Sequence, residues 1–114
     1  MTSTKRRHER IESLNLLSYA CVDEAGEIVA QGMGRTLNVS EGGIMLETHE
    51  SISTSRIRLT IGFKDDVTEV EGQVAYTKEG GNQRSQTGIE FVRPDAEASN
   101  VIKRYIEAFN RQAD

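Results

Sequence analysis

The stretch RIRLTIGF, residues 56–63, alternates between apolar side chains and polar or small ones. A period of two places every second side chain on the same face of an extended chain. Such alternation is typical of a β-strand with one buried and one solvated face. The stretch therefore predicts a half-buried strand, and its inward side chains are Ile57, Leu59, Ile61 and Phe63.

The same period recurs along the chain between clusters of turn-forming residues. Residues 28–37 and 43–47 are two further extended candidates. Six short strands at regular spacing, each with one apolar face, predict an antiparallel β-barrel or sandwich. The other inward sets are Val70, Gly72, Val74 and Tyr76, then Thr87, Ile89 and Phe91, and a less regular set of Leu14, Leu16, Ser18, Ala20 and Val22.

The pattern changes after Pro94, where apolar residues recur in steps of one, three and four. These steps form one stripe of an α-helix, made of Val101, Ile102, Tyr105, Ile106 and Phe109. Asp95 or Ser99 is suited to cap the start of the helix. A single helix after six strands is expected to cover one opening of a barrel. We therefore predict a basic arm over 1–12, a barrel over 13–93, and a helix with a tail over 94–114.

Charge is distributed unevenly over the 114 residues, which carry a net charge of −4. Residues 1–10 hold four basic residues and one acidic residue, whereas the remainder holds ten basic and seventeen acidic residues, a net −7. An acidic body argues against duplex nucleic-acid binding, and a basic arm indicates a local anion site. No apolar run is long enough to span a membrane, and the N-terminus lacks the apolar core of a signal peptide. With Cys21 as the sole cysteine, we expect a cytoplasmic protein.

Motifs for catalysis or metal binding are nearly absent from the sequence. His8 and His49 lack metal-ligand spacing with each other or with Cys21, which is expected to be a packing residue. Asp65 and Asp66 are expected to lie in a solvated turn. The chain contains neither a Gly-x-Ser-x-Gly motif nor a phosphate loop. We therefore predict a protein that is not an enzyme and has no metal site.

Two segments remain, KRRHER at residues 5–10 and NVSEGG at residues 38–43. Together they resemble the PilZ domain, a bacterial receptor module for the second messenger cyclic di-GMP. Arg6 and Arg10 match the family's Arg-x-x-x-Arg arm. Asn38, Ser40 and Gly43 match the family's Asp/Asn-x-Ser-x-x-Gly motif. The run GIEF at 88–91 resembles the family's last strand.

The resemblance extends from residue 5 to about residue 110 and implies a six-stranded antiparallel split barrel with a C-terminal helix. Two features depart from the usual pattern. The family often has Asp where this chain has Asn38, and the segment between Arg10 and Asn38 is longer than usual. We assign the additional length to a longer first hairpin around Gly26.

The chemistry of cyclic di-GMP accounts for these residue types. A planar guanidinium donates paired hydrogen bonds to phosphate or to the O6 and N7 atoms of guanine. The Asn38 carboxamide oxygen and the Ser40 hydroxyl can accept hydrogen bonds from guanine. Gly43, with Gly42, removes a Cβ where ligand and backbone approach closely. The ligand residues implied by the resemblance are Arg6, Arg7, Arg10, Asn38, Ser40, Gly42 and Gly43.

The resemblance implies a receptor or adaptor that binds cyclic di-GMP, needs no cofactor, changes conformation and signals to a protein partner. The first alternative is a PilZ-like protein-interaction adaptor without nucleotide binding. The second alternative is a barrel that binds single-stranded RNA, which would need aromatic platforms. The third alternative is a flavin enzyme, which would need a flavin site. The sequence leaves open the partner, the oligomeric state and the number of nucleotides bound. It also leaves open whether Lys5 and Arg7 touch ligand or face water.

Overall fold

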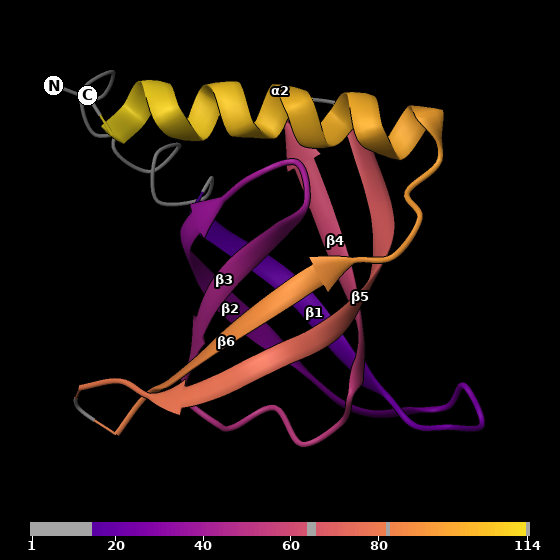
Figure 1. The fold of residues 1–114 in the computed structure, drawn as a ribbon, viewed down its shortest axis with the longest axis vertical. Coiled ribbons are helices and arrows are strands. Elements are labelled where there is room, and N and C mark those ends of the chain that lie inside the picture. The colour runs from indigo at the N-terminus through magenta and orange to yellow at the C-terminus, as the bar shows by residue number, and fades with distance from the viewer. Residues whose placement is uncertain (1–14, 64–65, 82, 114) are drawn as a thin grey trace, which may run out of the picture.

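Six antiparallel strands close into a barrel and one long helix follows them (Figure 1). The computed structural model describes residues 15–63, 66–81 and 83–113, so the predicted arm lies outside the described residues. The order around the barrel is β1-β2-β3-β6-β5-β4, and pairing of β1 with β4 closes it. This confirms the predicted barrel and helix. The elements are β1 (Leu16–Val22), β2 (Ile28–Val39), β3 (Gly43–Thr48), β4 (Arg56–Phe63), β5 (Asp66–Glu79), β6 (Ser85–Phe91) and α2 (Ala96–Ala113).

The alternating strand β4 supplies the centre of the core. Ile57, Leu59 and Ile61 are at most 1% exposed and belong to one buried cluster with side chains of β3, β6 and α2. Full burial of each such side chain stabilises the fold by about 1.5–3 kcal/mol. The period of two in RIRLTIGF therefore has the predicted consequence, an inward face that holds the barrel together.

The first part of strand β1 presents the opposite face to the one we predicted. Leu17 and Cys21 are buried, whereas Leu16 and Ser18 are exposed. The predicted inward set was therefore wrong for Leu16 and Ser18, because apolar residues occupy both faces of this strand and its alternation is ambiguous. Val22 is buried as predicted, and Leu14 lies outside the described residues. Cys21 is 3% exposed, which confirms that it is a packing residue.

Strand β5 begins as predicted and then changes face. Val70 is buried, but Tyr76 is 48% exposed, so its predicted place in the core was wrong. The pairing of β5 with β6 shifts between Val74 and Tyr76, which marks a β-bulge. One extra residue in a strand reverses the alternation beyond it. The bulge therefore turns Tyr76 to the outer face of the barrel.

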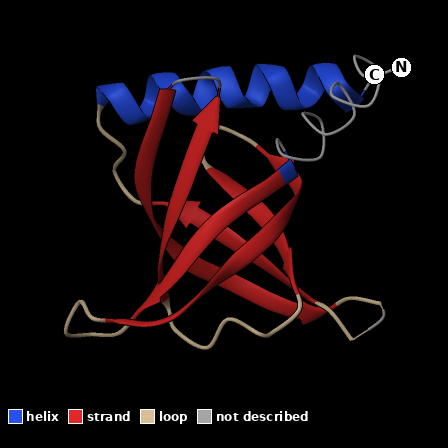
Figure 2. Cartoon of the chain, turned by 180° about the vertical axis from the view of Figure 1, so that it is seen from behind, coloured by secondary structure: helices blue, strands red, loops and turns tan. Residues whose placement is uncertain are grey.

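Helix α2 lies across one open end of the barrel (Figures 1 and 2). It begins after Asp95, whose carboxylate accepts a hydrogen bond from the Ala98 N–H at 2.8 Å, as an N-cap does. Tyr105 is fully buried under the helix, and its hydroxyl lies 2.9 Å from the Thr36 hydroxyl of β2. Burial raises the pKa of Tyr105, and the Thr36 hydrogen bond opposes that shift. The helix is thus fastened to β2 as well as to β4 and β5.

Candidate functional site

The predicted ligand motif forms a tight turn between β2 and β3. The Ser40 N–H donates to the Gly43 carbonyl at 2.8 Å, and the Gly43 N–H donates to the Ser40 carbonyl at 3.4 Å. The Ser40 hydroxyl accepts a hydrogen bond from the Gly42 N–H at 3.3 Å. The turn therefore spans four residues, Ser40 to Gly43, of the six-residue segment 38–43. The Ser40 Oγ atom thus helps to set the turn. Ser40 is also exposed, so a ligand can reach this atom.

Asn38 is the last outward-facing residue of β2. Pairing of β2 with β3 shifts between Thr36 and Asn38, so Leu37 forms a bulge. Thr36 on one side of the bulge is buried, and Asn38 on the other is exposed. Asn38 lies opposite Met45, two residues along the strand from the turn that contains Ser40. The bulge thus places the carboxamide on the outer surface beside the turn.

Gly43 is needed for contact within the barrel. A Cβ at Gly43 would lie 2.3 Å from the carbonyl oxygen of Ile89 in β6, a distance that backbone atoms cannot accommodate. Our prediction attributed Gly43 to close approach of a ligand, but the atom that excludes a side chain is this oxygen. Gly42 has open space around its Cβ position, and its carbonyl accepts a hydrogen bond from the Phe91 N–H at 3.0 Å. Strand β6 therefore holds the turn in place.

The topology brings the start of β1 to the same end of the barrel. Leu16, the first residue of β1, pairs with Arg35 in antiparallel register, so the start of β1 lies at the end of the barrel toward which β2 runs to Asn38. Asn38 lies about 10 Å beyond Arg35 at the usual strand rise. Five extended residues, the separation of Arg10 from Asn15, span at most about 17 Å. Arg10 can therefore reach the turn, although Arg6, Arg7 and Arg10 themselves lie outside the described residues.

The charges around the turn are acidic. Glu41 is exposed at the tip, and the exposed Glu90 of β6 lies opposite Gly43. The segment 38–43 contains no Lys or Arg. A phosphate bound here would therefore depend on cations from elsewhere in the chain, which is the role that the sequence suggested for the basic arm.

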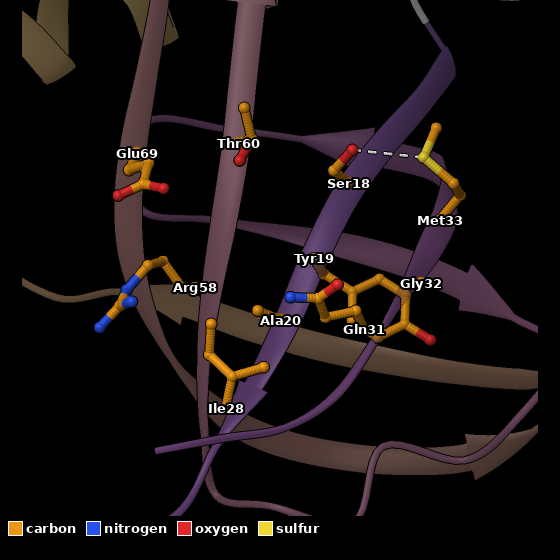
Figure 3. A pocket seen from close by; sticks show the side chains of 10 residues that line it. All are labelled: Ser18, Tyr19, Ala20, Ile28, Gln31, Gly32, Met33, Arg58, Thr60 and Glu69. Atoms are coloured by element: carbon orange, nitrogen blue, oxygen red, sulfur yellow. Dashed lines mark hydrogen bonds between the residues drawn. The ribbon is translucent and has the colours of Figure 1, made fainter. Parts of the chain in front are cut away.

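One hollow lies elsewhere on the barrel. It measures about 420 Å³ and opens on the outer surface of β1, β2, β4 and β5, where Ser18 donates to the Met33 sulfur at 3.3 Å (Figure 3). Arg58 and Glu69 bring opposite charges to its rim. The predicted ligand residues that the structure describes do not line it; these are Asn38, Ser40, Gly42 and Gly43. A shallow hollow with mixed charge offers no phosphate clamp, so we do not assign the nucleotide to it.

Other features of the described residues bear on chemistry and location. Asp66 was expected in a turn but begins β5, and its carboxylate accepts a hydrogen bond from the guanidinium of Arg104. Over the ranges that the structure describes, no cluster of three or more His, Cys, Asp and Glu side chains could hold a metal ion. Within those same ranges, no helix combines the length and apolar character needed to cross a membrane.

The fold and the turn together define a small closed β-barrel with a terminal helix and an exposed polar motif. Comparison with protein families agrees, because the PilZ domain model matches residues 4–108. The chain therefore belongs to the PilZ domain family. No curated protein matched the chain.

Three solved structures share the fold at low sequence identity. The PilZ domain with c-di-GMP of YcgR from Escherichia coli has a TM-score of 0.61 and 12% identity over 86% of this chain and 84% of that chain. The structure of K. pneumonia MrkH in its apo state has a TM-score of 0.60 and 13% sequence identity, over 85% of this chain and 47% of that chain. The Borreliella burgdorferi PlzA protein in complex with c-di-GMP has a TM-score of 0.52 and 12% sequence identity, over 93% of this chain and 50% of that chain. The aligned region covers about half of MrkH and PlzA.

Proposed function

We propose that this PilZ domain is a receptor for cyclic di-GMP. Family membership over residues 4–108 supports the proposal, and two of the similar structures, those of YcgR and PlzA, contain this nucleotide. The observation that carries it is the exposed turn Ser40–Gly43 beside Asn38, at the end of the barrel where β1 begins. Its polar atoms suit the base, and the arm's arginines suit the phosphates.

In this proposal the two halves of the site have different tasks. Asn38 and Ser40 accept hydrogen bonds from the N–H groups of guanine, while Arg6, Arg7 and Arg10 bind phosphate and the guanine edge. The protein acts as a receptor without catalysis: binding draws the arm over the turn and changes the surface presented to a protein partner. The conformational change and the partner are parts of the proposal that follow from the arm's charge.

Calorimetric titration with cyclic di-GMP tests the function, with GTP and cyclic AMP as controls. We expect binding of the cyclic dinucleotide alone and a loss of affinity of about 1–3 kcal/mol in Asn38→Ala. Because Asn38 is exposed, the thermal stability of this variant should match that of the parent. Asn38→Asp restores the acidic residue common in the family and should bind at least as tightly as the parent. A parent protein without affinity for cyclic di-GMP would favour the protein-interaction adaptor instead.

A further inference from the structure

The outer face over β1 is hollow because the side chains at its centre are short. Ser18 is exposed, and it lies opposite Met33 of β2 on one side and Thr60 of β4 on the other. Ala20, the next outward residue of β1, lies opposite Arg58. Directly opposite residues on neighbouring strands share one face of the sheet. The hollow of about 420 Å³ therefore lies above a serine, an alanine and a threonine, with a methionine wall on one side and a charged wall on the other (Figure 3).

Exposed apolar side chains border the hollow. Met33 is 54% exposed, and Leu16, two residues before Ser18 on the same face of β1, is 45% exposed. Ile28 also lines the hollow and is 48% exposed. Single exposed apolar residues are ordinary, but several of them beside one hollow are typical of an interaction surface. The face therefore has the character of a surface that a partner covers.

The charged wall is incompletely paired within the chain. The Glu71 carboxylate lies 3.8 Å from the Arg56 guanidinium and 4.0 Å from that of Arg58, so two cations share one anion. Glu69 lies opposite Thr60 on this face. Over the ranges that the structure describes, the Glu69 carboxylate takes part in no ion pair or hydrogen bond. The wall therefore presents both a guanidinium and a carboxylate to a partner.

We propose that this face binds the same face of a second copy of the chain. In a twofold dimer, each contact across the interface occurs twice, because each copy presents the same residues to the other. A face that carries both signs of charge can therefore complement itself. Arg58 of each copy pairs with Glu69 of the other, and the charges that the single chain leaves incompletely paired are matched in both copies.

The register of the strands makes this pairing compatible with apolar contact. Glu69 lies one strand over from Arg58 and two residues along, a step of about 5 Å across the sheet and about 7 Å along it. Leu16 is related to Met33 by the same step in the same direction, from β2 to β1. The midpoints of the two steps lie on one line that is nearly perpendicular to both. A twofold rotation about this line therefore sets Arg58 against Glu69 and also sets Met33 of each copy against Leu16 of the other.

The axis of that rotation runs within the interface, over Ser18 and Thr60. Their short side chains allow the two faces to approach where the copies are closest. The axis crosses the strands diagonally, so the strands of the two copies meet within about 20° of a right angle. Near-orthogonal crossing is one of the two ways in which sheets pack face to face. One arrangement thus satisfies the charges, the apolar contact and the packing of the sheets.

Sedimentation of the protein without cyclic di-GMP tests the dimer, because this proposal does not rest on the proposed function. We expect the parent to associate as its concentration rises. Arg58→Glu places two carboxylates together at both contacts, and Glu69→Arg places two guanidinium groups there. Each variant should therefore raise the dissociation constant of the dimer by about tenfold or more. Glu79→Arg is the control, because this exposed residue lies ten residues after Glu69 on β5, and it should associate like the parent.

A mixture of the two charge variants gives the sharpest outcome. Arg58→Glu and Glu69→Arg together place opposite charges at both contacts. An equimolar mixture should therefore sediment as a dimer at a concentration where each variant alone is monomeric, a recovery that misfolding cannot produce. A mixture that stays monomeric contradicts the pairing. A parent that stays monomeric at about 1 mM overturns the proposal, as it would if the hollow takes a different protein.

The apolar contact has a test of its own. Met33 is exposed, so neither Met33→Lys nor Met33→Leu should change the thermal stability of the single chain. The lysine variant would bury an ammonium group against Leu16 of the other copy, so its association should weaken by about fivefold or more. The leucine variant keeps an apolar side chain and should associate like the parent. Equal association of the two variants contradicts the contact between Met33 and Leu16.

Discussion

Gly42 and Gly43 are adjacent in the turn but tolerate a side chain differently. Gly43→Ala would bring a Cβ to 2.3 Å from the Ile89 carbonyl oxygen, so we expect a loss of about 1–3 kcal/mol in the free energy of unfolding. Gly42→Ala meets no atom within 4 Å and should change stability by no more than about 0.5 kcal/mol. Urea denaturation of the two variants measures this difference, and equal stabilities would contradict the close contact with β6.

The same two variants distinguish an effect on the fold from an effect on ligand binding. Because Gly42→Ala leaves the barrel intact, any loss of cyclic di-GMP affinity in this variant reports contact between ligand and turn. We expect such a loss. A weaker affinity in Gly43→Ala alone would instead be explained by displacement of the turn from β6.

The arginines of the arm carry the largest expected effect of single residues. Arg6→Ala or Arg10→Ala should each weaken binding by about 2–4 kcal/mol, because each removes a charge-assisted contact with phosphate or guanine. The corresponding lysine variants keep the charge but lose the paired donors, so they should recover only part of the affinity. Titration calorimetry measures both series. An alanine variant that binds like the parent would remove that arginine from the proposed site.

At the scale of elements, the hydrogen bond between Thr36 and Tyr105 connects β2, the strand that carries Asn38, with α2. Thr36 lies two residues before Asn38, and its hydroxyl is 2.9 Å from that of Tyr105 in a buried environment. Tyr105→Phe leaves the buried Thr36 hydroxyl without this bond, which should cost about 1–3 kcal/mol. Combining it with Thr36→Val removes both hydroxyls and should cost less than the sum of the single variants. Additive losses in urea denaturation would contradict direct coupling of helix and strand.

The sequence could predict the elements wherever one apolar pattern dominated. Strand β4 and the stripe of α2 met this condition, and their buried residues are those expected, including Ile57 and Tyr105. Strand β1 did not, because Leu16 and Leu17 are equally apolar and only the neighbouring strands select the buried one. The face of Tyr76 could not be predicted either. A bulge arises from pairing between strands, and the alternation of apolar and polar residues in the sequence does not reveal it.

At the scale of the whole molecule, the motif at 38–43 was visible in the sequence because its residues are contiguous. The proximity of the start of β1 to that motif was not visible, since it depends on the pairing of Leu16 with Arg35. The alignment of Asn38, Met45, Gly88 and Tyr76 on neighbouring strands likewise requires three strand pairings at once. A site assembled across a barrel therefore becomes predictable from sequence only in its contiguous parts.

The arm and the barrel should respond to ligand as one unit. The four cations of residues 1–10 repel one another and face a single acidic residue, so without a ligand we expect little to oppose their conformational entropy. Cyclic di-GMP would supply two phosphates near the turn and draw the arm across it. We therefore expect amide hydrogen exchange over residues 5–12 to slow when the nucleotide is added, and the effect to weaken in high salt because salt screens exposed charges. The double variant Arg6→Ala/Arg10→Ala is the control and should show no such protection. Equal exchange with and without nucleotide, in a parent that calorimetry shows to bind, would mean that the arm is not the part that responds.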